Sequence, residues 1–405
     1  MAFGRRASSL VYREYTLVLA PRPDDMSHRR ECAGQDRGSL TRHEGDHYNG
    51  GIRIPWAYPM QDHDERLALL TGWLSRELGL PVRRIEPASS DASFRRYFRA
   101  VCGERTFIIM DAPPAKETVR PYLQVSGLLE PLGVHVPHVY EADVDRGLLL
   151  LEDLGSTPYL ERLATGDAQR LYDEALRSLA QIQVRGAEAA QRLAPYDREP
   201  LLRELALMPE WFLQRHLAIE PSASERRMLQ AAFEFLITEA LDQPQVFVHR
   251  DYHSRNLMVT AERNPGVIDF QDALRGPVGY DLVSLLEDCY ISWPRERVVG
   301  WVRAYRERLA SVAGPAGADA QQFLRWFDLI GVQRHLKVLG IFARLWYRDG
   351  KSGYLRDLPL TLRYVRDTCA RYRELGELSE FLERRVAAEL PRANERAAAG
   401  AMRAS

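Results

Sequence analysis

Two short polar stretches contain the residues whose types and spacing could do chemistry. The first runs from His249 to Asn256 with Asp251 inside it, and the second places Asp269 directly after two apolar residues. Phosphoryl transfer needs a carboxylate that orients the attacking hydroxyl and accepts its proton, and further oxygen ligands that hold Mg²⁺ on the nucleotide phosphates. The spacing therefore predicts Asp251 as the catalytic base, and Asn256 and Asp269 as the metal ligands.

The alternative interpretation is that these are ordinary turn residues. Asp251 and Asn256 are residue types that favour turns, and Asp269 could simply cap a strand. The spacing, however, matches the protein-kinase signature, in which H-R-D-x-x-x-x-N is followed by a second aspartate. Because that second aspartate is present at the required distance, the sequence favours the catalytic interpretation.

Three further residues near this loop are predicted to support it. Histidine in such a loop can act as a general acid or a ligand, but we expect His249 to pack beneath the loop and hydrogen-bond to backbone, and His253 to shape the turn. Asp281 begins a later helix. It could hydrogen-bond to the catalytic loop from below or serve as a plain N-terminal cap, and the sequence does not decide between these roles.

The elements that must position these residues are short apolar strands. Residues 246–249 precede the loop, residues 256–260 follow it, and residues 266–270 contain the second motif. Each motif thus lies at the end of a strand, which would hold its polar side chains at a fixed boundary. From residue 158 onward the remaining apolar spacing is helical, and a capping box formed by Ser222 and Glu225 begins one of these helices.

The preceding part of the chain is predicted to be a small lobe built on antiparallel sheet. Apolar residues at helical spacing predict one helix over 67–78 and another over 117–129. Short strands are expected at 94–101, 105–111, 136–140 and 147–152, the first two as a hairpin. The last strand passes into a polar exit at Gly155, which suits a hinge between lobes. We expect the nucleotide to bind beneath this hinge, at Leu151, Glu152 and Asp153.

These patterns divide the chain into four predicted segments. Residues 1–59 have no sustained apolar periodicity and are assigned to a disordered extension, and Met60 reads as a natural beginning. Residues 60–153 are the N-terminal nucleotide-binding lobe. Residues 154–390 are the helical C-terminal lobe, with the catalytic loop and the acceptor site. Residues 391–405 are an Ala-rich flexible tail.

Composition excludes several other classes of protein. The formal net charge of -1 and the pI near 6.8 lack the basic excess that nucleic-acid binding requires. No apolar run reaches the roughly 18 residues of a membrane span. The four cysteines have no metal-ligand spacing, and Arg13 and Glu14 interrupt the stretch that superficially suggests an export signal. We therefore expect a cytoplasmic protein that acts on a small molecule.

The motifs resemble those of aminoglycoside phosphotransferases and choline kinases, a group similar in fold to protein kinases. Residues 249–258, 267–272 and 276–282 carry the resemblance, which covers roughly residues 62–350. It implies a two-lobed α+β fold, with a small antiparallel-sheet N-lobe and a mainly helical C-lobe. ATP and Mg²⁺ are the implied cofactors.

A closer resemblance is to the bacterial anomeric kinases of cell-wall recycling. It rests on the strings at 90–98, 110–114, 249–256 and 333–340, and it implies that the amino sugars N-acetylmuramate and N-acetylglucosamine are phosphorylated at C1. An alternative function is that of a phosphotransferase for an aminoglycoside or a choline-like amino alcohol. Such an enzyme would need an acidic pocket for its cationic acceptor. A nucleotide-binding pseudokinase is a further alternative, although the presence of Asp251, Asn256 and Asp269 argues against it.

One part of the protein-kinase pattern is missing. Protein kinases carry a lysine on the third strand that pairs with the nucleotide phosphates, but residues 107–111 contain none. Either Lys116 swings back, or Arg95 or Arg96 supplies the charge, since guanidinium binds phosphate oxygens bidentately. Both arginines come from the loop that contains Ser93, which we also expect to bind the nucleotide. The alternative is an exposed, arginine-rich hairpin face, and the sequence leaves this choice open.

Basic residues on a long predicted helix are the candidates for acceptor binding. Arg334 and Lys337 are spaced to share one side of that helix, and Arg344 could join them. The resemblance implies that they hold the lactate carboxylate of a muramate. The alternative is that all three charges are simply solvated at the surface.

Overall fold

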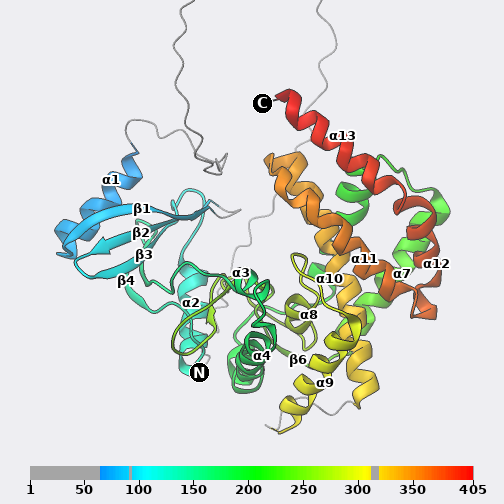
Figure 1. Cartoon of the computed structure of the whole chain (residues 1–405), viewed down its shortest axis with the longest axis horizontal. Helices are drawn as coiled ribbons and strands as arrows, with labels where there is room; N and C mark the ends of the chain where they lie inside the picture. The colour runs from blue at the N-terminus through cyan, green and yellow to red at the C-terminus, as the bar shows by residue number, and fades with distance from the viewer. Residues whose placement is uncertain (1–63, 91–93, 312–318, 405) are drawn as a thin grey trace, which may run out of the picture. The chain divides into compact units, whose positions relative to one another are not determined.

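The computed structural model describes residues 64–90, 94–311 and 319–404 (Figure 1). The extension assigned to residues 1–59 and the loop residue Ser93 lie outside the described residues. In the unit that starts at residue 61, an antiparallel sheet is followed by a mainly helical region, which confirms the predicted α+β class.

The N-lobe is built on a five-stranded antiparallel sheet with the strand order β1-β2-β3-β5-β4. The strands are β1 Val82–Ser90, β2 Arg96–Cys102, β3 Arg105–Asp111, β4 Val139–Asp143 and β5 Leu148–Glu152. The predicted hairpin is β2–β3, and its turn holds Gly103 at φ 66°, a left-handed conformation that glycine adopts without strain. Strand β1 was not predicted from the sequence.

Two helical segments cover opposite faces of this sheet because successive strand residues point to opposite sides. Leu148 and Leu150 pack with α1 Glu65–Gly72 and the following π-helical turn η1 Trp73–Glu77. Leu149 and Leu151 pack instead with α2 Arg120–Leu129. This second cluster continues without a break into the helices of the C-lobe, so the two lobes share one hydrophobic core.

The C-lobe contains helices and two small antiparallel ladders (Figure 1). After η2 Glu130–Leu132 and strands β4 and β5, the helical elements are α3 Tyr159–Leu163, α4 Ala168–Arg185, α5 Ala187–Ala190, α6 Arg198–Leu205, η3 Met208–His216, α7 Ala223–Leu241, α8 Tyr280–Leu286, α9 Arg295–Ser311, α10 Ala320–Asp349, η4 Ser352–Asp357, α11 Leu358–Cys369, η5 Arg373–Leu375, α12 Gly376–Phe381, η6 Leu382–Val386 and α13 Glu389–Ala404. The ladders pair β6 Gln245–Val248 with β9 Leu274–Pro277, and β7 Leu257–Met258 with β8 Gly266–Val267.

Local sequence signals account for several helix ends. The predicted capping box begins α7, because the Ser222 hydroxyl accepts from the Glu225 N–H and the Glu225 carboxylate accepts from the Ser222 N–H. The long helix α10 begins at the N-cap Asp319. No helix among the described residues combines the length and the apolar character needed to cross a bilayer.

The C-terminal segment differs from the prediction. Residues 391–405 were assigned to a flexible tail, but α13 extends through Ala404. Leu390, Ala393 and Ala397 are buried along one side of it. Their spacing of three and four residues is that of a helix face, and small alanine side chains allow close packing. An Ala-rich composition was therefore a poor guide to flexibility here.

Candidate active site

The catalytic loop begins where β6 ends and closes at β7. Its first residues are His249, which is buried, and Arg250, whose φ of 78° is unusual for a residue with a side chain. Asp251 follows and is partly buried. The loop is closed by backbone hydrogen bonds from His253 N to Asp251 O at 3.0 Å and from Asn256 N to His253 O at 2.9 Å.

The three residues predicted to do the chemistry lie together. Asn256 Nδ2 donates to Asp251 O at 3.0 Å and to Asp269 Oδ2 at 3.2 Å. Asp269 follows β8 and has a φ of 65°, and its Oδ1 accepts from Gln271 Nε2 at 2.7 Å. Amide and carboxylate oxygens are ligands of the kind that Mg²⁺ uses beside nucleotide phosphates. The side chains present at Asn256 and Asp269 therefore fit such an ion.

Asp281 fastens the start of the loop. Its Oδ2 accepts from His249 N at 2.7 Å and its Oδ1 accepts from Arg250 N at 2.9 Å. No side chain caps α8, whose N-cap residue is Gly279, so Asp281 supports the loop rather than the helix. Burial raises the pKa of Asp281 to about 7, against the lowering effect of these two hydrogen bonds.

His249 lies beneath the loop, as predicted. Its Nδ1 lies 3.3 Å from the Asp251 N–H, and its Nε2 lies 3.1 Å from Ile268 O. Burial lowers its pKa to about 4. A neutral ring with the proton on Nε2 satisfies both contacts, so His249 ties the two motifs together.

A second carboxylate, which the sequence analysis missed, fastens the far end of the loop. Asp288 Oδ2 accepts from Ser254 N at 3.0 Å and also from the Ser254 hydroxyl. Asp288 is buried just beyond α8. One short segment thus supplies two carboxylates, Asp281 and Asp288, that hold the catalytic loop at both ends.

Arg95 is the N-lobe cation that the structure brings to the motifs. It is only 9% exposed, and its guanidinium lies 3.3 Å from Glu117 Oε1 and 3.9 Å from Asp269 Oδ1. Lys116 is exposed on the rim, with its amine 5.5 Å from the centre of the Phe94 ring. Of the three alternatives for the missing strand lysine, the geometry favours Arg95.

Arg96 does not belong to this site, contrary to the prediction. Its guanidinium donates to Asp111 Oδ2 at 2.5 Å and also pairs with Asp64 at the N-cap of α1. Arg66 shares the same Asp111 carboxylate, which is fully buried. Arg96 therefore joins α1 to the start of β2 and the end of β3.

The hinge side chains are occupied by contacts within the protein. Leu151 is buried in the sheet between β3 and β4. Glu152 Oε2 accepts from His138 N at 3.2 Å, and Asp153 is held by Arg99 through hydrogen bonds of 2.7 and 2.9 Å. A nucleotide at this hinge would therefore be contacted by backbone rather than by these carboxylates.

The cations on α10 are buried, so the alternative of surface solvation is wrong for Arg334 and Lys337. Lys337 Nζ lies 3.0 Å from both Glu204 Oε1 and Tyr280 OH. Arg334 is 4% exposed, with a 3.7 Å contact from Nη1 to Cys289 Sγ, and its Nε has no hydrogen-bond partner within residues 64–90, 94–311 and 319–404. Arg344 lies about 15 Å further along the helix, given a rise of ~1.5 Å per residue, and does not join them.

The charges of these cations act on Asp251. Burial is the largest influence on the pKa of Asp251 and acts to raise it, but Lys337, followed by His253 and Arg250, lowers that pKa below its ordinary value. Asp251 is thus ionised near neutral pH, as a proton acceptor must be.

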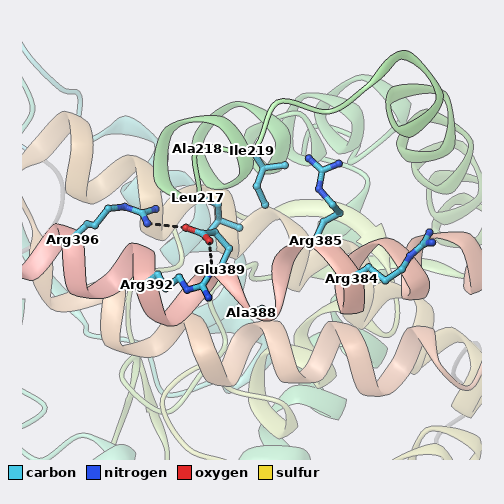
Figure 2. Close-up of a pocket in the computed structure, with 9 residues that line it drawn as sticks. All are labelled: Leu217, Ala218, Ile219, Arg384, Arg385, Ala388, Glu389, Arg392 and Arg396. Carbon is cyan, nitrogen blue, oxygen red and sulfur yellow. Dashed lines mark hydrogen bonds and ion pairs between the residues drawn. The ribbon is translucent and has the colours of Figure 1, made fainter.

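A separate surface pocket of about 430 Å³ contains none of the predicted site residues. Its walls are residues 217–219 and a row of arginines from η6 and α13, with Glu389 between Arg392 and Arg396 (Figure 2). It holds no residue positioned as a base for transfer chemistry, and we do not assign it to the active site.

Comparisons with known proteins find a family model and close relatives that match most of this chain. The family model described as "Phosphotransferase enzyme family" matches residues 84–327. A protein of Pseudomonas aeruginosa named N-acetylmuramate/N-acetylglucosamine kinase is 48% identical over 75% of this chain and 89% of its own length. A protein of the same name from Pseudomonas putida is 43% identical over 80% of this chain and 97% of its own length.

Solved structures share the fold at low sequence identity. The choline kinase LicA from Streptococcus pneumoniae superposes with a TM-score of 0.53 at 13% identity, covering 76% of this chain and 99% of that protein. An ethanolamine kinase from Plasmodium vivax gives a TM-score of 0.54 at 11% identity, covering 78% and 92%. These likenesses concern the fold alone.

Proposed function

Because the chain belongs to the phosphotransferase enzyme family, we propose that it uses ATP to phosphorylate the C1 hydroxyl of N-acetylmuramate and N-acetylglucosamine. It is an ATP-dependent phosphotransferase that acts on a hydroxyl group. The choice of sugar is supported by the two relatives of that name, which are 48% and 43% identical. In this proposal the N-lobe, residues 60–153, binds the nucleotide, and residues 154–390 hold the acceptor. The reaction would take place in the cytoplasm, where ATP and cell-wall breakdown products are both present.

The proposed reaction is a direct in-line transfer. Asp251 accepts the proton of the C1 hydroxyl while that oxygen attacks the γ-phosphorus, and the bond from the γ-phosphorus to the β,γ-bridging oxygen breaks to release ADP. The ionised state of Asp251, maintained by Lys337 and Arg250, suits it to this role. His249, Asp281 and Asp288 fix the loop so that Asp251 meets the hydroxyl in one geometry.

The nucleotide phosphates are proposed to meet two sets of groups. Asn256 and Asp269 would hold Mg²⁺, which supplies charge neutralisation on the phosphoryl oxygens when bound. Arg95 would bind phosphate oxygens in place of the strand lysine, with Glu117 orienting its guanidinium. Lys116, which is exposed, is a second candidate for binding the nucleotide phosphates.

The observation that carries the choice of acceptor class is the pair of buried cations beside Asp251. Choline and aminoglycosides are cationic, and Arg334 and Lys337 would repel them. Among the residues that the structure describes, the guanidinium of Arg334 has only a thiol contact, so an acceptor carboxylate could complete its hydrogen bonding. N-acetylmuramate carries such a group. N-acetylglucosamine does not, and we expect it to rely on the other contacts.

The test is a comparison of acceptors with the purified chain, ATP and Mg²⁺. N-acetylmuramate and N-acetylglucosamine should release ADP and give products that no longer reduce copper, because phosphorylation at C1 removes the reducing end. Methyl N-acetylglucosaminide should be inert, since its C1 oxygen has no proton for Asp251 to accept. Choline and an aminoglycoside serve as the cationic controls. A product that still reduces copper, or turnover of the methyl glycoside, would overturn the C1 assignment.

A further inference from the structure

A buried carboxylate that belongs to no recognised motif lies behind the catalytic loop. Glu204, near the end of α6, is 9% exposed. It accepts from Arg250 Nη2 at 2.5 Å and lies 3.0 Å from Lys337 Nζ, and it also accepts from the Tyr196 hydroxyl. Three segments far apart in the sequence therefore meet on one carboxylate.

The contact with Arg250 concerns the residue directly before Asp251. Arg250 has a φ of 78°, a conformation that a residue with a side chain keeps only when its surroundings impose it. Asp281 holds its N–H, and Glu204 holds its guanidinium, which lies over the Tyr196 ring at 5.8 Å. Backbone and side chain are thus fixed from two different helices.

The contact with Lys337 concerns the charge beside Asp251. Lys337 is 7% exposed, and its ammonium group contacts Glu204 and the Tyr280 hydroxyl. A buried ammonium with four rotatable bonds needs such partners to keep one position. Without Glu204, two cations, the partly buried Arg250 and the buried Lys337, would lose their shared counter-charge.

We propose that Glu204 is a positioning residue that presets the catalytic loop by holding the guanidinium of Arg250 and the ammonium group of Lys337. Protein kinases often order their activation segment through an arginine and a phosphate added by modification. Here α6 provides the anion permanently, so the loop needs no covalent activation. The inference rests on the proposed role of Asp251 as base, and it adds a residue that does not touch either substrate.

The test compares Glu204→Gln with Glu199→Gln, a matched change on the same helix. Glu199 is 86% exposed and pairs with Arg203 at the protein surface, so its variant should behave as wild type. Glu204→Gln should lower kcat by about 10- to 100-fold, because a misplaced catalytic group loses rate on this scale. The KM for ATP should stay within about threefold, since the predicted nucleotide contacts lie elsewhere. Unchanged kcat, or equal losses in kcat and ATP affinity, would overturn the proposal.

A second pair of variants covers the case in which Glu204→Gln does not fold. Lys337→Met combined with Glu204→Gln removes one buried charge of each sign and keeps the net charge of the cluster. If Glu204 also positions Arg250, the double variant should have a kcat about tenfold below that of Lys337→Met alone. Equal kcat values for these two proteins would overturn the proposal. All values are ratios between variants, so any acceptor that the wild type phosphorylates will serve, and an error in the proposed sugar would show separately.

Discussion

Replacing Arg95 by methionine separates the nucleotide role proposed for this arginine from the structural role of its neighbour. Arg95 lies at the boundary of the lobes, 3.9 Å from Asp269 Oδ1, where two opposite charges interact by about 4 kcal/mol at an effective dielectric constant of ~20. The loss of ATP use that can be measured is smaller than this energy, because water and Mg²⁺ also compensate the charge of Asp269. A charge-assisted hydrogen bond to a phosphate contributes about 1.5–3 kcal/mol.

That range corresponds to a loss of about 10- to 150-fold in kcat/KM for ATP. Glu117 and Asp269 are 26% and 32% exposed, so water can solvate them after the substitution and the melting temperature should change little. Arg95→Lys keeps the charge but loses the planar fork, and we expect an intermediate loss.

Arg96→Met is the matched control, one residue along the chain. Arg96 pairs with Asp64 and Asp111 away from the motifs, so its loss should lower the free energy of unfolding by about 1–2 kcal/mol and leave kcat/KM for ATP within about threefold. Steady-state kinetics and thermal unfolding of both variants decide the matter. The reasoning fails if Arg95→Met keeps full kcat/KM, or if Arg96→Met impairs ATP use as strongly.

Two further predictions concern the motifs and a buried acid. Asp251→Asn should keep ATP binding while kcat falls by about 10²–10⁴. Asp269→Ala should instead weaken nucleotide binding, and only when Mg²⁺ is present. Titration of ATP with and without Mg²⁺ distinguishes the two variants, and near-normal turnover of Asp251→Asn would refute the base assignment. Burial raises the pKa of Glu287 to about 7, above its unfolded value of 4.5, so stability from this group is present at low pH and is lost as pH rises through 7. Between pH 5 and pH 8, the free energy of unfolding of Glu287→Gln should therefore rise relative to that of the wild type by on the order of 2–3 kcal/mol. Denaturant unfolding at several pH values measures this difference, and a difference that does not change with pH would contradict the prediction.

Local sequence signals were sufficient for much of the fold and for the reacting groups. Asp251, Asn256 and Asp269 lie on loops whose ends are fixed by neighbouring strands, so their spacing along the chain predicts their spacing in the structure. Strands β1 and β9 were missed because each contains a proline, and β9 also a glycine, and these residues are depleted in strands. They form because a partner strand is available, which is a tertiary effect.

The supporting residues could not be predicted because their roles depend on distant segments. Glu204 lies in a helix rich in charged residues, so the sequence predicts a surface position for it. It is buried because α10 and the catalytic loop pack against it. Arg95 and Arg96 are adjacent, and adjacent residues of an extended chain point to opposite sides. Which one faces the motifs depends on the register of β2, and the sequence carries no signal for that choice.

The shared hydrophobic core has a consequence for how such proteins can be recombined. The hinge after β5 looks like a natural point at which to exchange lobes between relatives, since a single covalent connection crosses it there. Yet Leu149 and Leu151 belong to the same cluster as the C-lobe helices, so a crossover at the hinge would join halves whose buried surfaces evolved with other partners. Exchange of α1 and η1 disturbs only the smaller cluster on the opposite face of the sheet. Natural and engineered variation should therefore accumulate more freely on that outer face than across the inner one.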